Sequence, residues 1–311
     1  METLNTAFMD YARRAMQITK SPTVVTEDNV FQEGSEEILS YLDKMVEALI
    51  LPGSGFDGFE NMENLYNKAR EGKSCLLLLE HYSNLDLSLF SYLLRKAGSI
   101  GNEIYRSVVA IAGMKLTEDN PAVNAFASAY TRIVIYPSRS LQHLDSEKNR
   151  AELVRSNAIN RAAMKALMSI KHRGRLILLF PSGTRFRPWD PSTKRGVREI
   201  NSYIKTFDYM CLVAINGEIL HVHEGDMMDD TVSKDVVRLT AGPVLSCREF
   251  HEKAVLKADT KKHDPESSGE GGNEASENNL PDLKQAVADA IMSELEIMHA
   301  QGEEKRKQFL P

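Results

Sequence analysis

The chain has 311 residues, and at roughly 150 residues per domain this length predicts one large domain or two smaller ones. Apolar residues make up 42% and charged residues 26%, which excludes a wholly disordered chain, a collagen and a coiled-coil rod. The formal net charge is −6, so no nucleic-acid partner is expected and any anion site must be local.

The first part of the chain is predicted to be helical. Ser35 begins a capping box that opens an apolar pattern at helical spacing, and a turn cluster from Pro52 to Gly58 ends it. A second helix is expected from Asn61 to Glu71. Because no strand signal is visible here, residues 1–72 are predicted to form an N-terminal helical subdomain.

From Ser74 onward, short apolar runs alternate with helical stretches. The runs, which are typical of buried strands, cover residues 75–79, 108–113, 132–136, 175–180, 210–215 and 236–242. The helical stretches between them cover residues 85–96, 121–130 and 145–171. This alternation predicts an α/β fold with a mixed, largely buried β-sheet flanked by helices.

The last part of the chain contains a polar segment and a final helix. Residues 257–280 are rich in Gly, Ser and Glu without an apolar stripe, so a flexible insertion is predicted. Leu283, Val287, Ile291 and Leu295 then share one helical face that must dock on the core. The α/β domain is therefore expected to comprise residues 73–256 and 281–311.

The cysteines and the apolar runs indicate a cellular compartment. Cys75, Cys211 and Cys247 form no C-x-x-C pair, which predicts reduced, buried thiols in a cytoplasmic protein. The N-terminal stretch has acidic residues and no apolar core, so no secretory signal is expected. All wholly apolar runs are far shorter than the roughly 18 residues that a membrane-spanning helix needs.

The first candidate site is the segment HYSNLD, which follows a predicted strand and precedes a predicted helix. Asp86 can accept the Nδ1 proton of His81 and leave Nε2 free as a base, as in a hydrolase triad without its serine. The alternative is structural, because Ser83 and Asp86 also match an N-terminal helix cap. From these residues alone both interpretations remain open.

The second candidate site lies in residues 171–198, which contain eight basic residues and one acid. After the predicted strand, the loop PSGTRFR contains Gly183, Thr184, Arg185 and Arg187, whose backbone N–H groups and guanidinium groups suit a phosphate. The alternative is a solvated basic face. Arg139, also beyond a predicted strand, is a further candidate for a phosphate contact.

Two histidines after a predicted strand form a weak candidate for a metal site. His221 and His223 have strand spacing with acids nearby, but no third ligand follows at a recognised spacing, so no metal site is expected. The chain also contains no G-x-S-x-G and no G-x-x-x-x-G-K-[ST].

The two candidate sites together carry a resemblance to a known family. HYSNLD and FPSGTR, about a hundred residues apart, resemble the H-x-x-x-x-D and F-P-[EDS]-G-[TG]-R motifs of the glycerolipid acyltransferase superfamily. The chain looks most like the plastid-type and bacterial glycerol-3-phosphate acyltransferases that lack membrane spans. It departs from the plant-type enzymes at Ser140, where they have a histidine.

The resemblance implies a reaction and a site. His81 would be the general base and Asp86 its orienting partner, and Arg139, Gly183, Thr184, Arg185 and Arg187 would bind the substrate phosphate. A long-chain acyl group would pass from acyl carrier protein or coenzyme A to the sn-1 hydroxyl of glycerol 3-phosphate. No permanently bound cofactor is expected. Peripheral membrane contact for product release is expected, in the cytoplasm or, after removal of a transit peptide, the plastid stroma.

Two other functions are consistent with these residues. The first is the same chemistry at the sn-2 hydroxyl of lysophosphatidate. The second is a non-catalytic module that binds acyl carrier protein or anionic lipid through residues 171–198, with HYSNLD only capping a helix. The first alternative predicts turnover with a different acceptor, and the second predicts binding without turnover.

Overall fold

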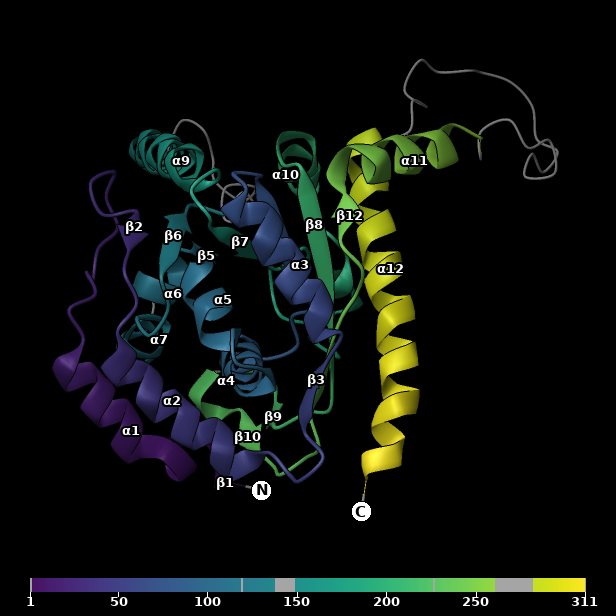
Figure 1. Cartoon of the computed structure of the whole chain (residues 1–311). Helices are drawn as coiled ribbons and strands as arrows, with labels where there is room; N and C mark the ends of the chain where they lie inside the picture. Colours follow the sequence, from purple (N-terminus) through teal and green to yellow (C-terminus); the bar gives the residue numbers. More distant parts are fainter. Residues whose placement is uncertain (1, 119, 138–148, 226, 261–281, 311) are drawn as a thin grey trace, which may run out of the picture.

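The computed structural model describes residues 2–118, 120–137, 149–225, 227–260 and 282–310, and its largest element is a mixed β-sheet (Figure 1). Among the described residues nine strands form this sheet in the order β2-β6-β5-β7-β4-β8-β11-β3, with β12 also paired to β8. The strands are β2 (Phe31–Gln32), β3 (Gly55–Asp57), β4 (Cys75–Leu79), β5 (Val108–Gly113), β6 (Arg132–Ile135), β7 (Leu176–Leu179), β8 (Tyr209–Asn216), β11 (Arg238–Ala241) and β12 (Leu245–Ser246).

The five central strands of the sheet are parallel. Strands β6, β5, β7, β4 and β8 run in one direction, and β4 holds Leu77 level with Leu178 of β7 and with Cys211 of β8. Parallel strands of matching register end at the same edge of a sheet. The residues that follow β4 and β7 are therefore neighbours, although about a hundred residues separate them in the sequence.

Helices cover both faces of the sheet, and β4 shows how its side chains alternate between them. Leu77 and Leu79 point into one hydrophobic cluster, and Leu76 and Leu78 point into the other. The helices on the first face are α1 (Leu4–Ile18), α2 (Glu36–Leu49), α3 (Phe59–Arg70), α4 (Asp86–Ala97), α5 (Gly101–Ser107) and α7 (Pro121–Ala127). The helices on the second face are α9 (Arg150–Ile170), α10 (Ile200–Thr206), α11 (Cys247–Thr260) and α12 (Leu283–Arg306). The predicted α/β class, a mixed and largely buried sheet between helices, is confirmed.

The remaining elements are short. A small antiparallel sheet consists of β1 (Glu2–Thr3), β10 (Thr231–Val232) and β9 (Leu220–His221), and it joins the start of the chain to the region after β8. The other short pieces are α6 (Lys115–Glu118) and the 3-10 turns η1 (Pro191–Lys194), η2 (Met227–Asp229) and η4 (Lys307–Phe309).

The expectation that the front of the chain contains no strand is wrong. Strand β2 pairs with β6, and β3 pairs with β11 at the far edge of the sheet. Both strands are two or three residues long and are held by backbone pairing, so they leave no side-chain alternation in the sequence. Ser35 does cap α2, where its side chain accepts from the backbone N–H of Ile38. The boundary at residue 72 stays a prediction.

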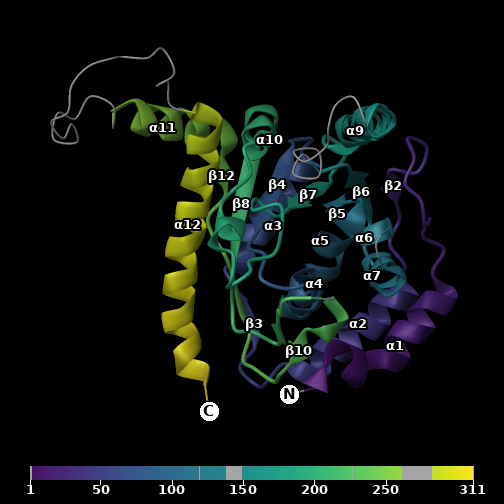
Figure 2. The ribbon, with the colours of Figure 1, turned by 180° about the vertical axis from the view of Figure 1, so that it is seen from behind.

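The last helix forms where the sequence predicts it, but the first residues of the expected insertion are helical. Residues 257–260 are the last turn of α11, and residues 261–280 of the predicted insertion lie outside the described part of the chain. Helix α12 lies along the β8 side of the sheet, and both views show it on the side away from α1 and α2 (Figures 1 and 2). Most of its predicted stripe is buried, since Val287, Ile291 and Leu295 have no exposed surface, whereas Leu283 at the start of the helix is 39% exposed.

The three cysteines are free and buried, as predicted. Burial raises the pKa of each thiol to about 12, so Cys75, Cys211 and Cys247 stay protonated near neutral pH and are poor nucleophiles. Within the described ranges, no helix has the length and apolar character needed to cross a membrane.

Candidate active site

The predicted pair of His81 and Asp86 is formed at the end of β4. His81 follows the strand by two residues, Asp86 is the first residue of α4, and His81 Nδ1 lies 2.9 Å from Asp86 Oδ2. The Asp86 side chain is 2% exposed and the His81 side chain 18%. The carboxylate is thus shielded from water, while the histidine ring keeps an open edge.

The Asp86 carboxylate organises the turn between β4 and α4. Oδ2 accepts from the backbone N–H groups of Tyr82 (2.6 Å) and Ser83 (2.9 Å) as well as from His81, and Oδ1 accepts from the Ser83 hydroxyl (2.8 Å). Because a carboxylate only accepts hydrogen bonds, the ring nitrogen that faces it must be a donor. Nδ1 of His81 therefore carries the proton, and Nε2 is left with a free lone pair.

The helix-cap interpretation of HYSNLD describes part of this turn. Ser83 and Asp86 do bond each other as that interpretation predicts, and the Ser83 hydroxyl accepts from the backbone N–H of Leu85. Leu85, the N-cap residue of α4, has no side-chain cap of its own. The Asp86 carboxylate also faces His81, so the two interpretations hold together in this turn.

The loop after β7 contacts His81 directly. The His81 ring stacks on Phe180 with ring centroids 4.0 Å apart, and the backbone N–H of Phe186 donates to the His81 carbonyl at 2.8 Å. These contacts fix the ring plane and the backbone of His81 at once. The two predicted sites therefore meet, as the shared strand edge requires.

Gly183 shapes this loop. Its φ of +67° is rarely adopted by other residues, and a Cβ at this position would come within 2.9 Å of Val197. Its N–H donates to the Phe180 carbonyl at 2.9 Å, and the Ser182 hydroxyl donates to the Thr184 carbonyl at 2.6 Å. The glycine thus allows a tight turn whose backbone passes beside His81.

Arg185 departs from the expected role of a phosphate ligand. Its guanidinium forms an ion pair with Asp230, whose side chain is fully buried, and the Arg185 side chain is only 11% exposed. Asp230 also accepts from the backbone N–H of His223 at 2.9 Å. Because Asp230 already neutralises its charge, Arg185 fastens the loop to the protein.

The other predicted phosphate ligands have different positions. Gly183 lines the same cavity as His81, whereas the cavity lining, within the described residues, excludes Thr184, Arg185 and Arg187. Arg187 is partly exposed and forms no ion pair with any described residue. Arg139, with its neighbour Ser140, lies outside the described residues.

Half of the eight basic residues in the segment 171–198 form ion pairs with described acids. Besides Arg185, three of its basic residues form ion pairs with acidic residues of α12 or with Asp282, the N-cap residue of that helix. These are Lys194 with Glu296 (2.9 Å), Arg195 with Asp289 (3.3 Å) and Arg198 with Asp282 (2.7 Å). Since acids distant in the sequence balance these charges, the segment is a weaker anion site than its composition predicts.

His81 lies in the wall of a cavity of about 530 Å³, within the usual range for ligand sites. Its lining is mostly apolar and comes from both faces of the sheet, with Leu42 and Phe126 on one side and Ile135 and Tyr203 on the other. The cavity thus has lining residues on both faces of the sheet, and His81 is one of them.

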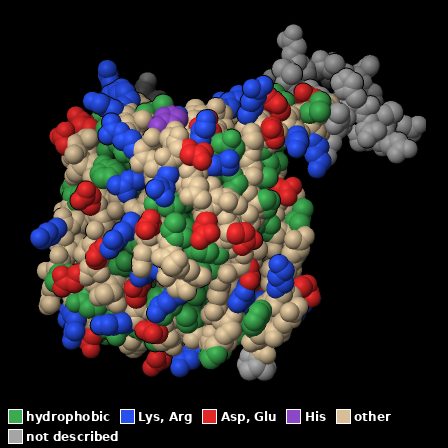
Figure 3. Space-filling model, viewed as in Figure 1, with side chains coloured by type: hydrophobic (Ala, Val, Ile, Leu, Met, Phe, Trp, Pro, Cys, Tyr) green, Lys and Arg blue, Asp and Glu red, His purple; other side chains and the backbone are tan. Residues whose placement is uncertain are grey.

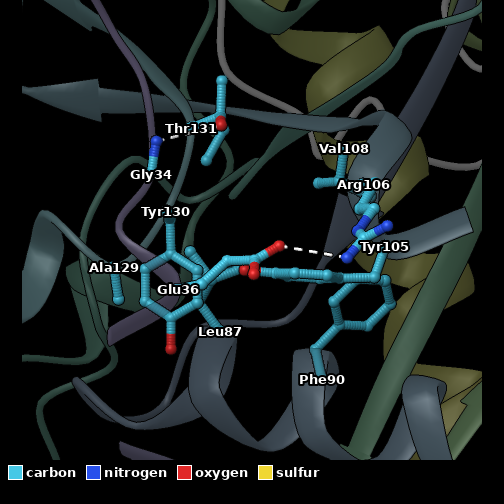
Figure 4. Close-up of a pocket in the computed structure, with 11 residues that line it drawn as sticks. Gly34, Glu36, Leu87, Phe90, Tyr105, Arg106, Val108, Ala129, Tyr130 and Thr131 are labelled. Atoms are coloured by element: carbon cyan, nitrogen blue, oxygen red, sulfur yellow. Dashed lines mark hydrogen bonds and ion pairs between the residues drawn. The ribbon is translucent and has the colours of Figure 1, made fainter. Parts of the chain in front are cut away.

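A second, smaller cavity of about 100 Å³ lies between α2, α4 and α5 (Figure 4). Arg106 and Glu36 meet across it in an ion pair of 3.1 Å, and both side chains are largely exposed. Tyr105 and Tyr130 form part of its wall. Because its carboxylate, Glu36, is paired with Arg106 and no histidine is among its described lining residues, we place the candidate active site in the larger cavity.

Sequence reasoning missed a polar cluster beside His81. Glu80 is 5% exposed and accepts from the backbone N–H of Ile215 (2.8 Å), from Tyr82 OH (3.0 Å) and from His299 Nδ1 of α12 (3.0 Å). An acid directly after a buried apolar strand is the one signal that the sequence carried. The cluster ties the last helix to the residues on both sides of His81.

Replacement of His299 by glutamine tests this tie through its pH dependence. The hydrogen bond to Glu80 raises the pKa of His299 above its ordinary value of 6.5, so the folded state binds the proton more tightly than the unfolded state. The stability advantage of the wild type over His299→Gln should be full below pH 6.5 and be lost as the pH rises through the raised pKa. Thermal unfolding between about pH 5.5 and pH 8.5 measures it.

The matched control is His172→Gln, because His172 is an exposed histidine whose Nδ1 contacts only a backbone carbonyl, that of Gly72. Its effect should be small at every pH. A stability difference for His299→Gln that does not change with pH would show that the protonated pair contributes nothing.

The two histidines considered for a metal have hydroxyl partners instead. His221 Nε2 lies 2.7 Å from the Ser233 hydroxyl, and His223 Nε2 lies 2.9 Å from the Thr231 hydroxyl. Within the described ranges, no three His, Cys, Asp or Glu side chains converge in the way that a metal ion needs.

A histidine oriented by a carboxylate, at the end of a parallel strand and beside a large apolar cavity, suits general-base chemistry on a substrate with an apolar part. A profile of the Acyltransferase family matches residues 58–227, which is more than half of the chain and includes His81, Asp86 and the Gly183 loop. The chain belongs to this family and is an acyltransferase. The predicted superfamily is thus confirmed.

Comparisons with individual proteins add a likeness to one solved structure. No curated protein matches the chain. Among solved structures, the 1-acyl-sn-glycerophosphate (LPA) acyltransferase PlsC of Thermotoga maritima is similar over 94% of this chain and 89% of that chain. The sequence identity is 14% and the TM-score 0.43.

Proposed function

We propose that this protein transfers a long-chain acyl group from a thioester of coenzyme A or acyl carrier protein to a hydroxyl of a phosphorylated glycerol. The observation that carries this proposal is the 2.9 Å contact between His81 and the buried Asp86 in the wall of a large apolar cavity. The contact gives the histidine a free Nε2, and the cavity offers room for an acyl chain. No resident cofactor is needed, since the acyl group arrives on its donor.

The chemistry follows from the pair. Nε2 of His81 takes the proton of the acceptor hydroxyl while the oxygen attacks the thioester carbonyl carbon, which gives a tetrahedral intermediate. Asp86 stabilises the imidazolium that forms. When the intermediate collapses, the C–S bond breaks and the proton passes from His81 to the leaving thiolate. The acyl group moves directly to the acceptor, without an acyl-enzyme.

The first acceptor that we propose is glycerol 3-phosphate, acylated at sn-1. Arg187 is the phosphate ligand we propose from the described part of the loop, because its guanidinium has no described carboxylate partner. Arg139 and the backbone around Gly183 and Thr184 would complete the phosphate site. Arg185 would act indirectly, since its pair with Asp230 holds the loop in place.

The second acceptor is lysophosphatidate, acylated at sn-2. The observation that favours it is that apolar side chains line the cavity on both faces of the sheet, with His81 between them. Such a cavity has room for a donor chain on one side and an acceptor chain on the other. Glycerol 3-phosphate has no alkyl chain, so it would leave the apolar lining on one face of the sheet without an apolar ligand.

One assay separates these proposals. Purified protein is supplied with a labelled long-chain acyl donor, on coenzyme A or on carrier protein, and with either acceptor at equal concentration. We expect labelled lysophosphatidate from glycerol 3-phosphate, or labelled phosphatidate if the second acceptor is correct. Donor binding without a labelled product from either acceptor would support a non-catalytic binding module and overturn the proposed function.

A further inference from the structure

Helix α9 has apolar side chains on its outer face as well as on its inner one. Ile159 and Leu167 are buried against the sheet, whereas Val154, Met164 and Met168 are 62%, 51% and 49% exposed. At about 100° per residue these three side chains fall within about 80° of arc. Among the described residues, no other helix exposes as many large apolar side chains. Packing of the core therefore does not explain why these exposed side chains are apolar.

The same face carries positive charge. Arg161 lies in this arc and Lys165 lies about 20° beyond its edge. Both side chains are exposed and form no ion pair with described residues. The single acid of the helix, Glu152, points to the opposite side and is bonded to Arg155 at 3.4 Å. In Figure 3, Lys, Arg and hydrophobic side chains lie next to one another along the top of the molecule, where Figure 1 places α9. We call Val154, Arg161, Met164, Lys165 and Met168 the α9 outer face.

The α9 outer face is continuous with the active-site cavity. Met164 is half exposed and also lines the cavity that contains His81, together with Ala163 and Leu167 of the same helix and Tyr203 of α10. An apolar path therefore leads from the surface at α9 to the histidine. An alkyl chain can follow such a path without crossing water.

We propose that the α9 outer face docks on the surface of an anionic lipid bilayer, so that the cavity opens toward the membrane. The proposal rests on the proposed function, because an enzyme that makes a lysophospholipid or a phospholipid must pass an alkyl chain between its cavity and a membrane. Apolar side chains on a convex helix penetrate the headgroup region, and neighbouring cations meet the lipid phosphates.

The shape of the face favours a bilayer over an acidic protein. Val154 and Met168 are 14 residues apart, so the exposed apolar side chains extend over about 21 Å of helix surface. A protein partner would need a complementary apolar groove of this length, whereas a lipid surface adapts to it. Binding to acyl carrier protein is therefore an outcome that the experiment must separate from binding to lipid.

The experiment is co-sedimentation of the full chain with vesicles, in the absence of substrate. The protein should sediment with phosphatidylglycerol vesicles and stay in solution with phosphatidylcholine vesicles, and its binding should fall as salt is added. The double variants Val154→Asp/Met168→Asp and Arg161→Glu/Lys165→Glu should each bind anionic vesicles at least about tenfold more weakly. None of these four residues lines the cavity within the described residues.

The matched control is Met9→Asp/Met16→Asp. These methionines are 40% and 41% exposed on α1, away from the α9 outer face, and the double variant should bind as the wild type does. Circular dichroism must show that all variants are folded. The proposal is overturned if neither vesicle type is bound, if the control loses as much affinity as the α9 variants, or if those variants lose only binding to acyl carrier protein. An inactive protein that still shows the expected vesicle binding would contradict the proposed function alone.

Discussion

Replacement of His81 by alanine is expected to lower kcat by about 10² to 10⁴-fold, because it removes the base that takes the proton of the acceptor hydroxyl. The protein should remain folded. Its Asp86 partner keeps hydrogen bonds from the backbone of Tyr82 and Ser83 and from the Ser83 hydroxyl. The loss is measured as the initial rate of labelled product formation at saturating donor and acceptor.

A suitable control is His172→Ala, since this histidine is exposed and bonds only the Gly72 carbonyl. It should turn over at the wild-type rate. If His81→Ala retained a rate close to that of the wild type, the direct-transfer mechanism would be wrong. A loss of rate accompanied by a loss of the folded state would not count, so thermal unfolding is recorded for both variants.

Replacement of Asp230 by alanine is expected to lower the free energy of unfolding by about 3 to 5 kcal/mol. The change removes a fully buried carboxylate and leaves the guanidinium of Arg185, which is 11% exposed, without its partner. It also removes the acceptor of the His223 backbone N–H. Equilibrium unfolding in urea measures the change.

The comparison is Asp289→Ala, which breaks the exposed pair with Arg195 and should cost at most about 1 kcal/mol. The double variant Arg185→Ala/Asp230→Ala should be less destabilised than the sum of the single variants, because it removes both buried charges. Equal, small losses for Asp230→Ala and Asp289→Ala would show that the buried pair does not anchor the loop.

The parts of the site that could be predicted are local in the sequence. His81 and Asp86 are five residues apart across a strand end and a helix start, so their contact follows from two short elements. The turn at Gly183 likewise depends on its neighbours. The long apolar strands of the sheet were predictable for the same reason, because each buried run is continuous. Strands β2 and β3 escaped prediction because backbone pairing with distant strands, rather than a side-chain pattern, forms them.

The partners of the charged residues depended on the path of the whole chain. Arg185 finds Asp230 and Glu80 finds His299, over 45 and 219 residues respectively. An arginine beside a glycine turn has the same neighbours in the sequence whether its guanidinium faces a phosphate or a buried carboxylate. The fold of the whole chain decides which of these groups lies close to it. Local residue chemistry was therefore enough to predict the contact between His81 and Asp86, whereas the folded chain determined which basic residues form ion pairs with acids.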